Sequence, residues 1–350
     1  MKKQRFLIRV DASPQIGAGH LMRMLALGQL LLDSGNEVHF ATIPYYPSIL
    51  TYLEKEPFHL HYLPQPSQWK QEKDLDALLS LMVSVNPSWV ILDGYQFSTD
   101  YEQAIKKKGV RLLKVDDLST QHCVADILLD QNHGAEQMES SMAPYTKKLA
   151  GLKYVLLRRE FRTAQIETKS ISEQGPFHIL VSLGGGSEIS DLLNLKIIQA
   201  FSELKDWNGS ATVVIGKMGQ QSRPLIELTK QASWPIQITA HVENMAYEMV
   251  KSDLAIVSGG STMWELLYMK VPFLAVSLNK AQEDYLEFLE QEELCVNLGW
   301  HEQLTSEKIQ TSVCNLAQNK TRSQILEHAD VLLERKNNGK KLLNLLNAEV

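Results

Sequence analysis

Cysteine is scarce in this sequence, which argues against the folds that depend on it. The 350 residues contain only Cys123, Cys295 and Cys314, and none of the three belongs to a Cys-x-x-Cys pair. An odd number of widely spaced cysteines argues against a disulfide framework and against a structural zinc site. We therefore expect buried free thiols, as is typical of a protein of the reducing cytoplasm.

An excess of positive charge and long apolar runs are also missing. The formal net charge is −6 and no long basic run occurs, which argues against nucleic acid or an anionic membrane surface as the main partner. No apolar run approaches the ~20 residues of a membrane span. The short apolar segment before Asp11 predicts a strand rather than a signal peptide. We expect a cytoplasmic protein with no obligate protein partner.

The short motifs of three large enzyme classes are absent. Gly-x-Ser-x-Gly, His-Glu-x-x-His and the P-loop pattern do not occur, which argues against a serine hydrolase, a zinc protease and a P-loop nucleotidase. Asp116 and Asp117 suit Mg²⁺ or the capping of a loop. His59 and His61 share one strand face, but no third ligand is evident, so a surface strand is the favoured interpretation. We predict neither a metal nor a cofactor.

Strand-like and helix-like segments alternate along most of the chain, which predicts an α/β protein with doubly wound parallel sheets. The strand-like segments are 5–10, 37–42, 88–95, 110–117, 125–132, 177–186, 210–216, 236–242, 254–260 and 272–278. The polar stretch 158–176 interrupts the pattern. The predicted division is a first domain over 1–157, a linker over 158–176, a second domain over 177–325 and a C-terminal helix over 326–350.

The first glycine-rich loop, residues 15–20, leads into a helix and ends on a histidine. Gly17 and Gly19 allow the backbone to approach a ligand closely. His20 follows at the positive end of the helix, which disfavours the imidazolium form and favours a neutral base. A capping or structural histidine is the alternative. The Gly-x-Gly-x-x-Gly fingerprint is incomplete, since Met22 follows, so a dinucleotide site is poorly supported.

Two further glycine-rich loops follow strands of the second half. Gly184, Gly185 and Gly186 allow a tight turn from strand to helix. Gly260, Ser261 and Thr262 begin another helix, where free amides and two hydroxyls suit phosphate oxygens. Glu265 is placed to bind the hydroxyls of a ribose. The alternative is a helix cap, with Glu265 completing a capping box. In the first half, Asp93 and Tyr95 directly follow a buried strand, at the edge where ligands bind.

Several of these segments together resemble a known family. The segments are 11–23 (DASPQIGAGHLMR), 115–132, 182–188 (SLGGGSE), 241–272 and 280–283 (KAQE). They are similar to the UDP-sugar hydrolases of pseudaminic acid biosynthesis, which are related to the MurG-type glycosyltransferases. The resemblance covers most of residues 5–300, and IGAGHLMR and GGSTMWELL are its most specific blocks. It implies a GT-B fold, in which two Rossmann-like domains face a cleft.

The resemblance also implies roles for individual residues. His20 matches the histidine that activates water in the family, and Asp93 and Tyr95 complete the candidate catalytic set. Ser261 and Thr262 match residues that bind a diphosphate. The remaining implied substrate-binding residues are Gly216, Glu243, Asn244 and Met245 around the uracil, Glu265 at the ribose, and Gln282 and Glu283 near the sugar. The implied reaction is the inverting, metal-independent attack of water at C1 of UDP-2,4-diacetamido-2,4,6-trideoxy-β-L-altrose.

Two positions depart from the family pattern. Gly94 stands where the family has a histidine between Asp93 and Tyr95, and Ala281 stands where it has an asparagine before Gln282. Asn279 is a possible substitute. Loss of a polar group at each position implies altered sugar specificity, or a related UDP-sugar as substrate.

Two other functions fit the same residues. A GT-B glycosyltransferase would use His20 to deprotonate an acceptor hydroxyl, and the apolar segment Ile43–Leu53 suits either a lipid-linked acceptor or core packing. A non-enzymatic binder would bind UDP without turnover. Release of UDP without an acceptor separates these functions.

Overall fold

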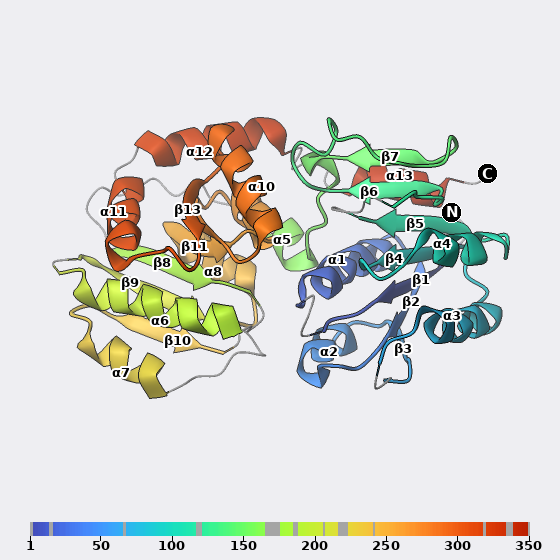
Figure 1. The fold of residues 1–350 in the computed structure, drawn as a ribbon, viewed down its shortest axis with the longest axis horizontal. Helices are drawn as coiled ribbons and strands as arrows, with labels where there is room; N and C mark the ends of the chain where they lie inside the picture. Colours follow the sequence, from blue (N-terminus) through green and yellow to red (C-terminus); the bar gives the residue numbers. More distant parts are fainter. Residues whose placement is uncertain are drawn as a thin grey trace. The chain divides into compact units, whose positions relative to one another are not determined.

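The computed structural model shows a chain of two compact units. It describes residues 3–13, 17–65, 68–116, 121–164, 176–184, 188–205, 207–215, 223–240, 242–317, 320–333 and 339–348. The first unit comprises Met1–Arg159 and Glu334–Val350, and the second comprises Glu160–Leu333. Each unit contains one sheet whose strands all run parallel, and helices connect most of the strands that follow one another in the sequence (Figure 1). This architecture confirms the predicted α/β class.

The first sheet has seven strands within the described residues. They are β1 (Arg5–Val10), β2 (Glu37–Thr42), β3 (His59–Tyr62), β4 (Trp89–Asp93), β5 (Arg111–Val115), β6 (Ile127–Asp130) and β7 (Lys147–Ala150). Their order is β3-β2-β1-β4-β5-β6-β7, a Rossmann order in which the direction of winding reverses between β1 and β4. All five residues of β4 are buried, as an apolar run in a central parallel strand predicts.

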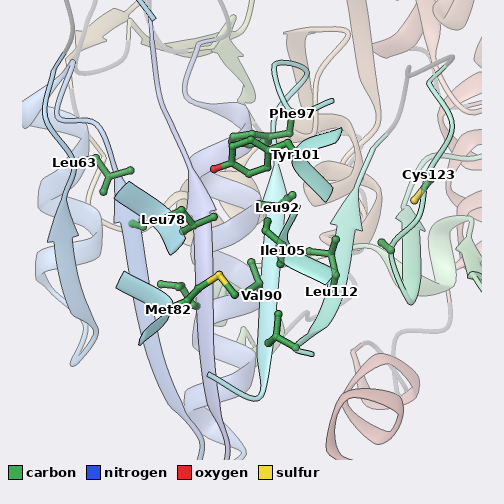
Figure 2. Close-up of a cluster of buried hydrophobic side chains, with 14 of the residues drawn as sticks. Leu63, Leu78, Met82, Val90, Leu92, Phe97, Tyr101, Ile105, Leu112 and Cys123 are labelled. Carbon is green, nitrogen blue, oxygen red and sulfur yellow. The ribbon is translucent and has the colours of Figure 1, made fainter. Parts of the chain in front are cut away.

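Helices cover both faces of this sheet. They are α1 (Gly19–Asp33), α2 (Pro47–Glu54), α3 (Gln71–Val85), α4 (Thr99–Lys106) and the short 3₁₀ helix η1 (Leu152–Tyr154). On one face, α3 and α4 pack over β1, β4 and β5 around Leu78, Tyr101 and Leu92 (Figure 2). Helix α2 buries the aliphatic side chains of Ile49 and Leu50, so core packing accounts for the apolar segment Ile43–Leu53.

The C-terminal segment contains two helices where the sequence predicts one. Helix α12 (Lys320–Leu332) belongs to the second unit and α13 (Lys340–Asn347) to the first. Gly339 precedes α13 with φ of 75°, a left-handed conformation that a continuous helix does not contain. The main-chain oxygen of Leu346 accepts hydrogen bonds from the side chains of Gln4 and Trp89, which precede or begin β1 and β4. Helix α13 therefore covers the amino ends of the first sheet.

The second unit repeats the same plan with six strands among its described residues. They are β8 (Phe177–Ser182), β9 (Gly209–Val214), β10 (Ile236–Thr239), β11 (Leu254–Ser258), β12 (Phe273–Ser277) and β13 (Val296–Trp300). The order is β10-β9-β8-β11-β12-β13, so the reversal lies between β8 and β11. The helices before α12 are α5 (Arg159–Thr163), α6 (Glu188–Glu203), α7 (Arg223–Gln231), α8 (Met245–Lys251), α9 (Thr262–Tyr268), α10 (Lys280–Gln291) and α11 (Ser306–Ala317).

The chain passes from one unit to the next inside the stretch that the sequence predicts as a linker. Arg159 donates hydrogen bonds to Asp33 and Glu56 of the first unit. The next residue, Glu160, accepts a hydrogen bond from the Met245 amide of the second unit. Arg159 is therefore bonded to the first unit, and Glu160, the next residue, is bonded to the second. None of the described helices is both long and apolar enough to cross a membrane.

Candidate active site

The candidate catalytic residues lie where the winding of the first sheet reverses. Strands β1 and β4 are neighbours, with Val10 paired to Asp93 at their carboxyl ends. The loop after β1 leads to His20, and the loop after β4 contains Tyr95. Loops that leave adjacent strands in opposite directions form a crevice, which is where ligands bind in open parallel sheets. The topology therefore accounts for the meeting of two segments that are distant in sequence.

His20, Asp93 and a third residue, Arg23, form one buried cluster at this point. Nδ1 of His20 lies 2.6 Å from Oδ1 of Asp93. Arg23 donates to both carboxylate oxygens of Asp93, at 2.6 Å from Nε to Oδ2 and 2.6 Å from Nη2 to Oδ1. The Asp93 side chain has no exposed surface, and His20 is 7% exposed. A bidentate guanidinium–carboxylate pair is a rigid support for the imidazole.

The charge of Asp93 determines which ring nitrogen of His20 carries the proton. Burial raises the pKa of Asp93, but the positive charge of Arg23, the field of His20 and their hydrogen bonds outweigh it and lower the pKa below its ordinary value of 3.8. Asp93 is therefore ionised at neutral pH and only accepts hydrogen bonds. Nη2 of Arg23 also lies 3.0 Å from Nδ1 of His20, but the shorter 2.6 Å contact of Nδ1 is with a carboxylate oxygen that can only accept. Nδ1 therefore donates to Asp93, which leaves the lone pair on Nε2. Within the described residues Nε2 has no protein hydrogen-bond partner.

Tyr95 and the glycine before it form the outer wall of this cluster. The Tyr95 ring stands edge-on to the His20 ring, with centroids 4.9 Å apart, and 45% of its surface is exposed. Gly94 has φ of 152°, and a Cβ there would lie 2.5 Å from Oε1 of Gln96. The side chain of half-buried Gln96 thus occupies the space beside Gly94. Its carboxamide has no protein partner among the described residues.

A buried ionic network anchors the start of the loop that carries His20. The Arg9 side chain, which has no exposed surface, bonds to Asp11 and Asp74. Asp11 also accepts a hydrogen bond from the Ile43 amide, 2.8 Å away. Gly17 adopts φ of 70° and donates to the Ser13 carbonyl at 2.8 Å, so a left-handed turn requires glycine there. This network fixes the base of the loop.

The helix that begins at Gly19 has no side-chain cap. Its N-cap residue, Ala18, offers no acceptor to the first amides of α1. Open space surrounds the position that a Cβ of Gly19 would take. His20 is therefore not a capping residue, which removes one of the two structural alternatives for this position. The other alternative, a purely structural histidine, is at odds with an Nε2 that has no partner in the part of the chain that the structure describes.

Two glycine-rich loops meet at the corresponding reversal of the second sheet. Strands β8 and β11 are neighbours, with Ser182 paired to Val257. Gly184 has φ of 96°, and a Cβ on either Gly184 or Gly260 would lie 4.0 Å from the Oγ of Ser258. The loops therefore lie on either side of one hydroxyl. Gly185 and Gly186 lie outside the described residues.

The start of α9 does not show the predicted capping box. Ser261 is the N-cap residue, but its φ and ψ of −59° and −20° are helical and its hydroxyl caps no amide. Glu265 follows it by four residues, one more than a capping box requires. Within the described residues, no hydrogen bond engages the hydroxyls of Ser261 and Thr262. The hydroxyls of Ser261 and Thr262 therefore do not serve as helix caps, and the side chains of both residues and of Glu265 are half-buried.

The residues before and within α10 have structural roles in this structure. Asn279 is the N-cap residue and accepts a hydrogen bond from the Gln282 amide at 3.0 Å. Oε1 of Gln282 accepts from the Leu278 amide at 2.9 Å, and its side chain packs on Gly259. Glu283 pairs with exposed Lys280. Since Asn279 caps the helix, it is not free to replace the asparagine that is absent at Ala281.

The segment predicted to surround a uracil lies at the start of α8. Asn244 caps this helix by accepting from the Tyr247 amide at 2.9 Å, and Glu160 accepts from the Met245 amide. Glu243 and Asn244 line a polar cavity of about 610 Å³ between α8 and strands β8, β9 and β10. Gly216, predicted to complete this pocket, lies outside the described residues.

Sequence reasoning missed Arg23 and Gln96. Arg23 follows His20 by three residues, a spacing that places both on one face of α1, so a helical projection of the segment would have found it. Gln96 carries no such signal, because its position depends on the left-handed turn at Gly94.

The chain is similar to known proteins both in part of its sequence and in its fold. Residues 180–343 match the glycosyltransferase family 28 C-terminal domain. The structure is similar to that of MurG from Acinetobacter baumannii, with a TM-score of 0.68, 15% identity, and coverage of 98% of this chain and 99% of that one. The calicheamicin glycosyltransferase CalG4 gives a TM-score of 0.65 at 13% identity, over 99% and 98% of the two chains. The chain therefore has the GT-B fold.

Sequence similarity identifies a narrower group of relatives than structural similarity does. The chain is 30% identical over 292 residues to the UDP-2,4-diacetamido-2,4,6-trideoxy-beta-L-altropyranose hydrolase of Campylobacter jejuni, covering 81% of this chain and 96% of that protein. An uncharacterized protein of Methanocaldococcus jannaschii is 27% identical over 81% of this chain and 58% of its own length. The chain belongs to the family of the Campylobacter hydrolase.

Proposed function

We propose that the protein hydrolyses UDP-2,4-diacetamido-2,4,6-trideoxy-β-L-altrose, or a closely related UDP-sugar, in a pathway of the pseudaminic acid type. The observation that carries the proposal is the pair of His20 and Asp93, with Nδ1 bound and Nε2 without a protein partner among the described residues. The 30% identity to the Campylobacter hydrolase supports the substrate class. The GT-B fold supports a nucleotide-sugar as ligand.

In the proposed reaction, Nε2 of His20 takes a proton from water as its oxygen attacks C1 of the sugar. The bond between C1 and the diphosphate oxygen breaks, the configuration at C1 inverts, and UDP leaves with the electron pair. Asp93 keeps the imidazole in the tautomer that can accept a proton and stabilises the imidazolium that forms. Arg23 keeps Asp93 ionised. Tyr95 borders the reacting atoms and excludes water from one side of the ring.

The second unit is proposed to hold UDP. The hydroxyls of Ser261 and Thr262, with backbone amides of the loops at Gly184 and Gly260, would stabilise the charge of the departing diphosphate. Glu265 would accept hydrogen bonds from the ribose. These residues follow the carboxyl ends of β8 and β11, the position at which nucleotides bind in Rossmann-like sheets. Gly17 and Gly19 would let the first loop approach the sugar.

The residues expected to contact the sugar are the ones at which this chain differs from the family pattern. Gly94 and Ala281 remove two polar side chains from the family pattern. The carboxamide of Gln96, which has no partner among the described residues, lies beside Gly94. We therefore expect Gln96 to supply a hydrogen bond to the sugar that a histidine at position 94 supplies elsewhere. With Gln96 in place of a histidine at position 94, the enzyme would favour a sugar whose amide or hydroxyl groups lie at other positions than in the family's substrate.

Glycosyl transfer is the second candidate function, because the structural relatives are glycosyltransferases. The experiment that separates the two is UDP release from the purified protein with no acceptor present. A hydrolase releases one UDP per free sugar at a rate that acceptors do not raise. A transferase releases none until an acceptor is added, and a binding protein that lacks turnover releases none in either case.

A further inference from the structure

Three imidazoles and a carboxylate gather on the first sheet, away from the candidate active site. Nε2 of His39 lies 3.0 Å from Oε1 of Glu37, and Nε2 of His59 lies 3.9 Å from the same oxygen. One ligand atom from each of these three side chains lies within 4.8 Å of the other two. Nδ1 of His39 lies 2.9 Å from Nε2 of His61. This group is called the histidine cluster below.

The register of two neighbouring strands brings the histidine cluster together. His39 pairs with His59 between β2 and β3, and His61 lies two residues further along β3. Residues two apart on a strand share a face, so Glu37 and His39 project to the same side as His59 and His61. Strand β3 is the edge of the sheet, which leaves His59 57% exposed while His39 is buried. An ion can therefore reach the cluster from solvent.

The spacing and the chemistry of these side chains suit one ion in particular. Zinc lies ~2.0–2.1 Å from its histidine and carboxylate ligands, which holds tetrahedral ligand atoms roughly 3.3 Å apart. The observed separations of 3.0 and 3.9 Å lie on either side of that value. Mg²⁺ and Ca²⁺ prefer sets of oxygen ligands, so a group dominated by imidazole selects a zinc-like ion.

We propose that Glu37, His39 and His59 bind one Zn²⁺ ion, with a solvent water as the fourth ligand, and that His61 orients the ring of His39. Ligating histidines generally form a hydrogen bond through their second ring nitrogen, and the contact between His39 and His61 supplies it. Lys3 pairs with the other oxygen of Glu37, at 3.2 Å from Oε2, and is 63% exposed. Its charge opposes the cation, but it contacts Oε2, whereas His39 and His59 both contact Oε1.

The position of the site indicates a structural role. Its ligands occupy the first and third positions of β2 and the first position of β3, whereas His20 follows the carboxyl end of β1. The ion would link the edge strand to its neighbour and would have no part in the reaction at His20. Because only the folded chain assembles the ligands, bound zinc should raise the melting temperature.

The test uses the full chain, with no polyhistidine tag, dialysed against Zn²⁺ or Co²⁺ and then against metal-free buffer. We expect one ion per chain by elemental analysis, a visible Co²⁺ spectrum of four-coordinate intensity, and a Tm that rises by a few degrees with Zn²⁺. His59→Ala, at an exposed position that should not disturb folding, and Glu37→Gln should lose all three effects. His61→Ala should bind about 10–100-fold more weakly.

His328→Ala is the matched control, because His328 also faces a carboxylate, at 3.5 Å from Glu293, but has no second imidazole. The His328→Ala variant should bind zinc as the wild type does. Because the ion has no part in the reaction at His20, UDP release by His59→Ala should equal that of the wild type. The proposal is overturned if the wild type retains no zinc, or if His59→Ala and Glu37→Gln bind it unchanged. Equal loss of zinc from His328→Ala would also overturn it, since binding would then be nonspecific.

Discussion

Nδ1 of His20 lies 2.6 Å from Oδ1 of Asp93, although the two residues are 73 positions apart in the sequence. The carboxylate accepts a hydrogen bond from the Nδ1–H group, so the other ring nitrogen is left with its lone pair. Hydrolysis by activated water requires this tautomer. Either side chain of this pair can be replaced separately to test its role.

Replacing Asp93 by asparagine should remove the charge and keep the shape. An amide at this position can donate to Nδ1 and thereby move the imidazole proton to Nε2, the nitrogen proposed to act as the base. We expect kcat for UDP release to fall by about 10³–10⁴-fold, as for comparable dyads. The Kd for UDP, measured by calorimetry, should not change. Loss of UDP binding in parallel would show that Asp93 has a different role.

Arg23→Gln should destabilise the first unit. The variant leaves buried Asp93 without its guanidinium partner, and breaking such a pair costs about 3–5 kcal/mol. The pH dependence has a defined sign. In the wild type the pKa of Asp93 is lowered, so its ion pair stabilises the fold above pH 3.8 and this contribution is lost as pH falls further. The variant lacks the contribution at every pH.

The measurement is chemical denaturation of both proteins at neutral pH and in acid. The stability difference between them should be largest at neutral pH and should shrink as the solution is acidified, because protonation of Asp93 removes the charge that Arg23 pairs with. A difference that stayed constant, or grew in acid, would mean that the charge of Asp93 is not what Arg23 stabilises. Arg162→Gln, in the second unit, is a control for the general loss of one arginine.

Gln96→Ala tests the proposed contact with the sugar. Loss of one hydrogen bond to a sugar amide or hydroxyl costs about 1–3 kcal/mol, or about 5–150-fold in kcat/KM. Inhibition by UDP alone should be unaffected, since UDP lacks the sugar. Gln103→Ala, at an exposed position on α4, should match the wild type. Equal kcat/KM values for Gln96→Ala and the wild type would remove Gln96 from the account of specificity.

Glu265→Ala tests the proposed ribose site. The variant should bind UDP about 5–150-fold more weakly, while kcat at saturating substrate changes little. Calorimetry with UDP gives the affinity directly, and Glu287→Ala on α10 serves as a control that removes the same charge at an exposed site. Unchanged affinity for UDP would show that the ribose does not contact Glu265.

Much of the fold could be predicted from the sequence. Apolar runs such as that of β4 and alternating helices define two parallel α/β units, because buried parallel strands must be apolar on both faces. The path of the C-terminal segment could not be predicted. Its apolar residues Leu342 and Leu346 are buried in the first unit, and helical spacing alone does not indicate which surface a helix covers.

The candidate site was predictable in part. Strand ends indicate that the loop of His20 and the loop of Asp93 lie at one edge, but the contact between them depends on β1 and β4 being neighbours. Arg23 was detectable from its spacing to His20. The position of Gln96 was not, because it depends on φ at Gly94. Of the histidine cluster, His59 and His61 were recognisable as a pair on one strand face, but the third ligand was not, since Glu37 and His39 become partners of His59 only through strand register.

The most direct test of the central claim is hydrolysis of UDP-2,4-diacetamido-2,4,6-trideoxy-β-L-altrose in ¹⁸O-labelled water, with EDTA and no acceptor, by the wild type and by His20→Asn. We predict that the wild type places the label in the free sugar and none in UDP, and that His20→Asn binds UDP normally but releases almost none from the sugar. Label in UDP would mean cleavage at phosphorus, and undiminished release by His20→Asn would mean that another group activates the water. Either result would contradict the account.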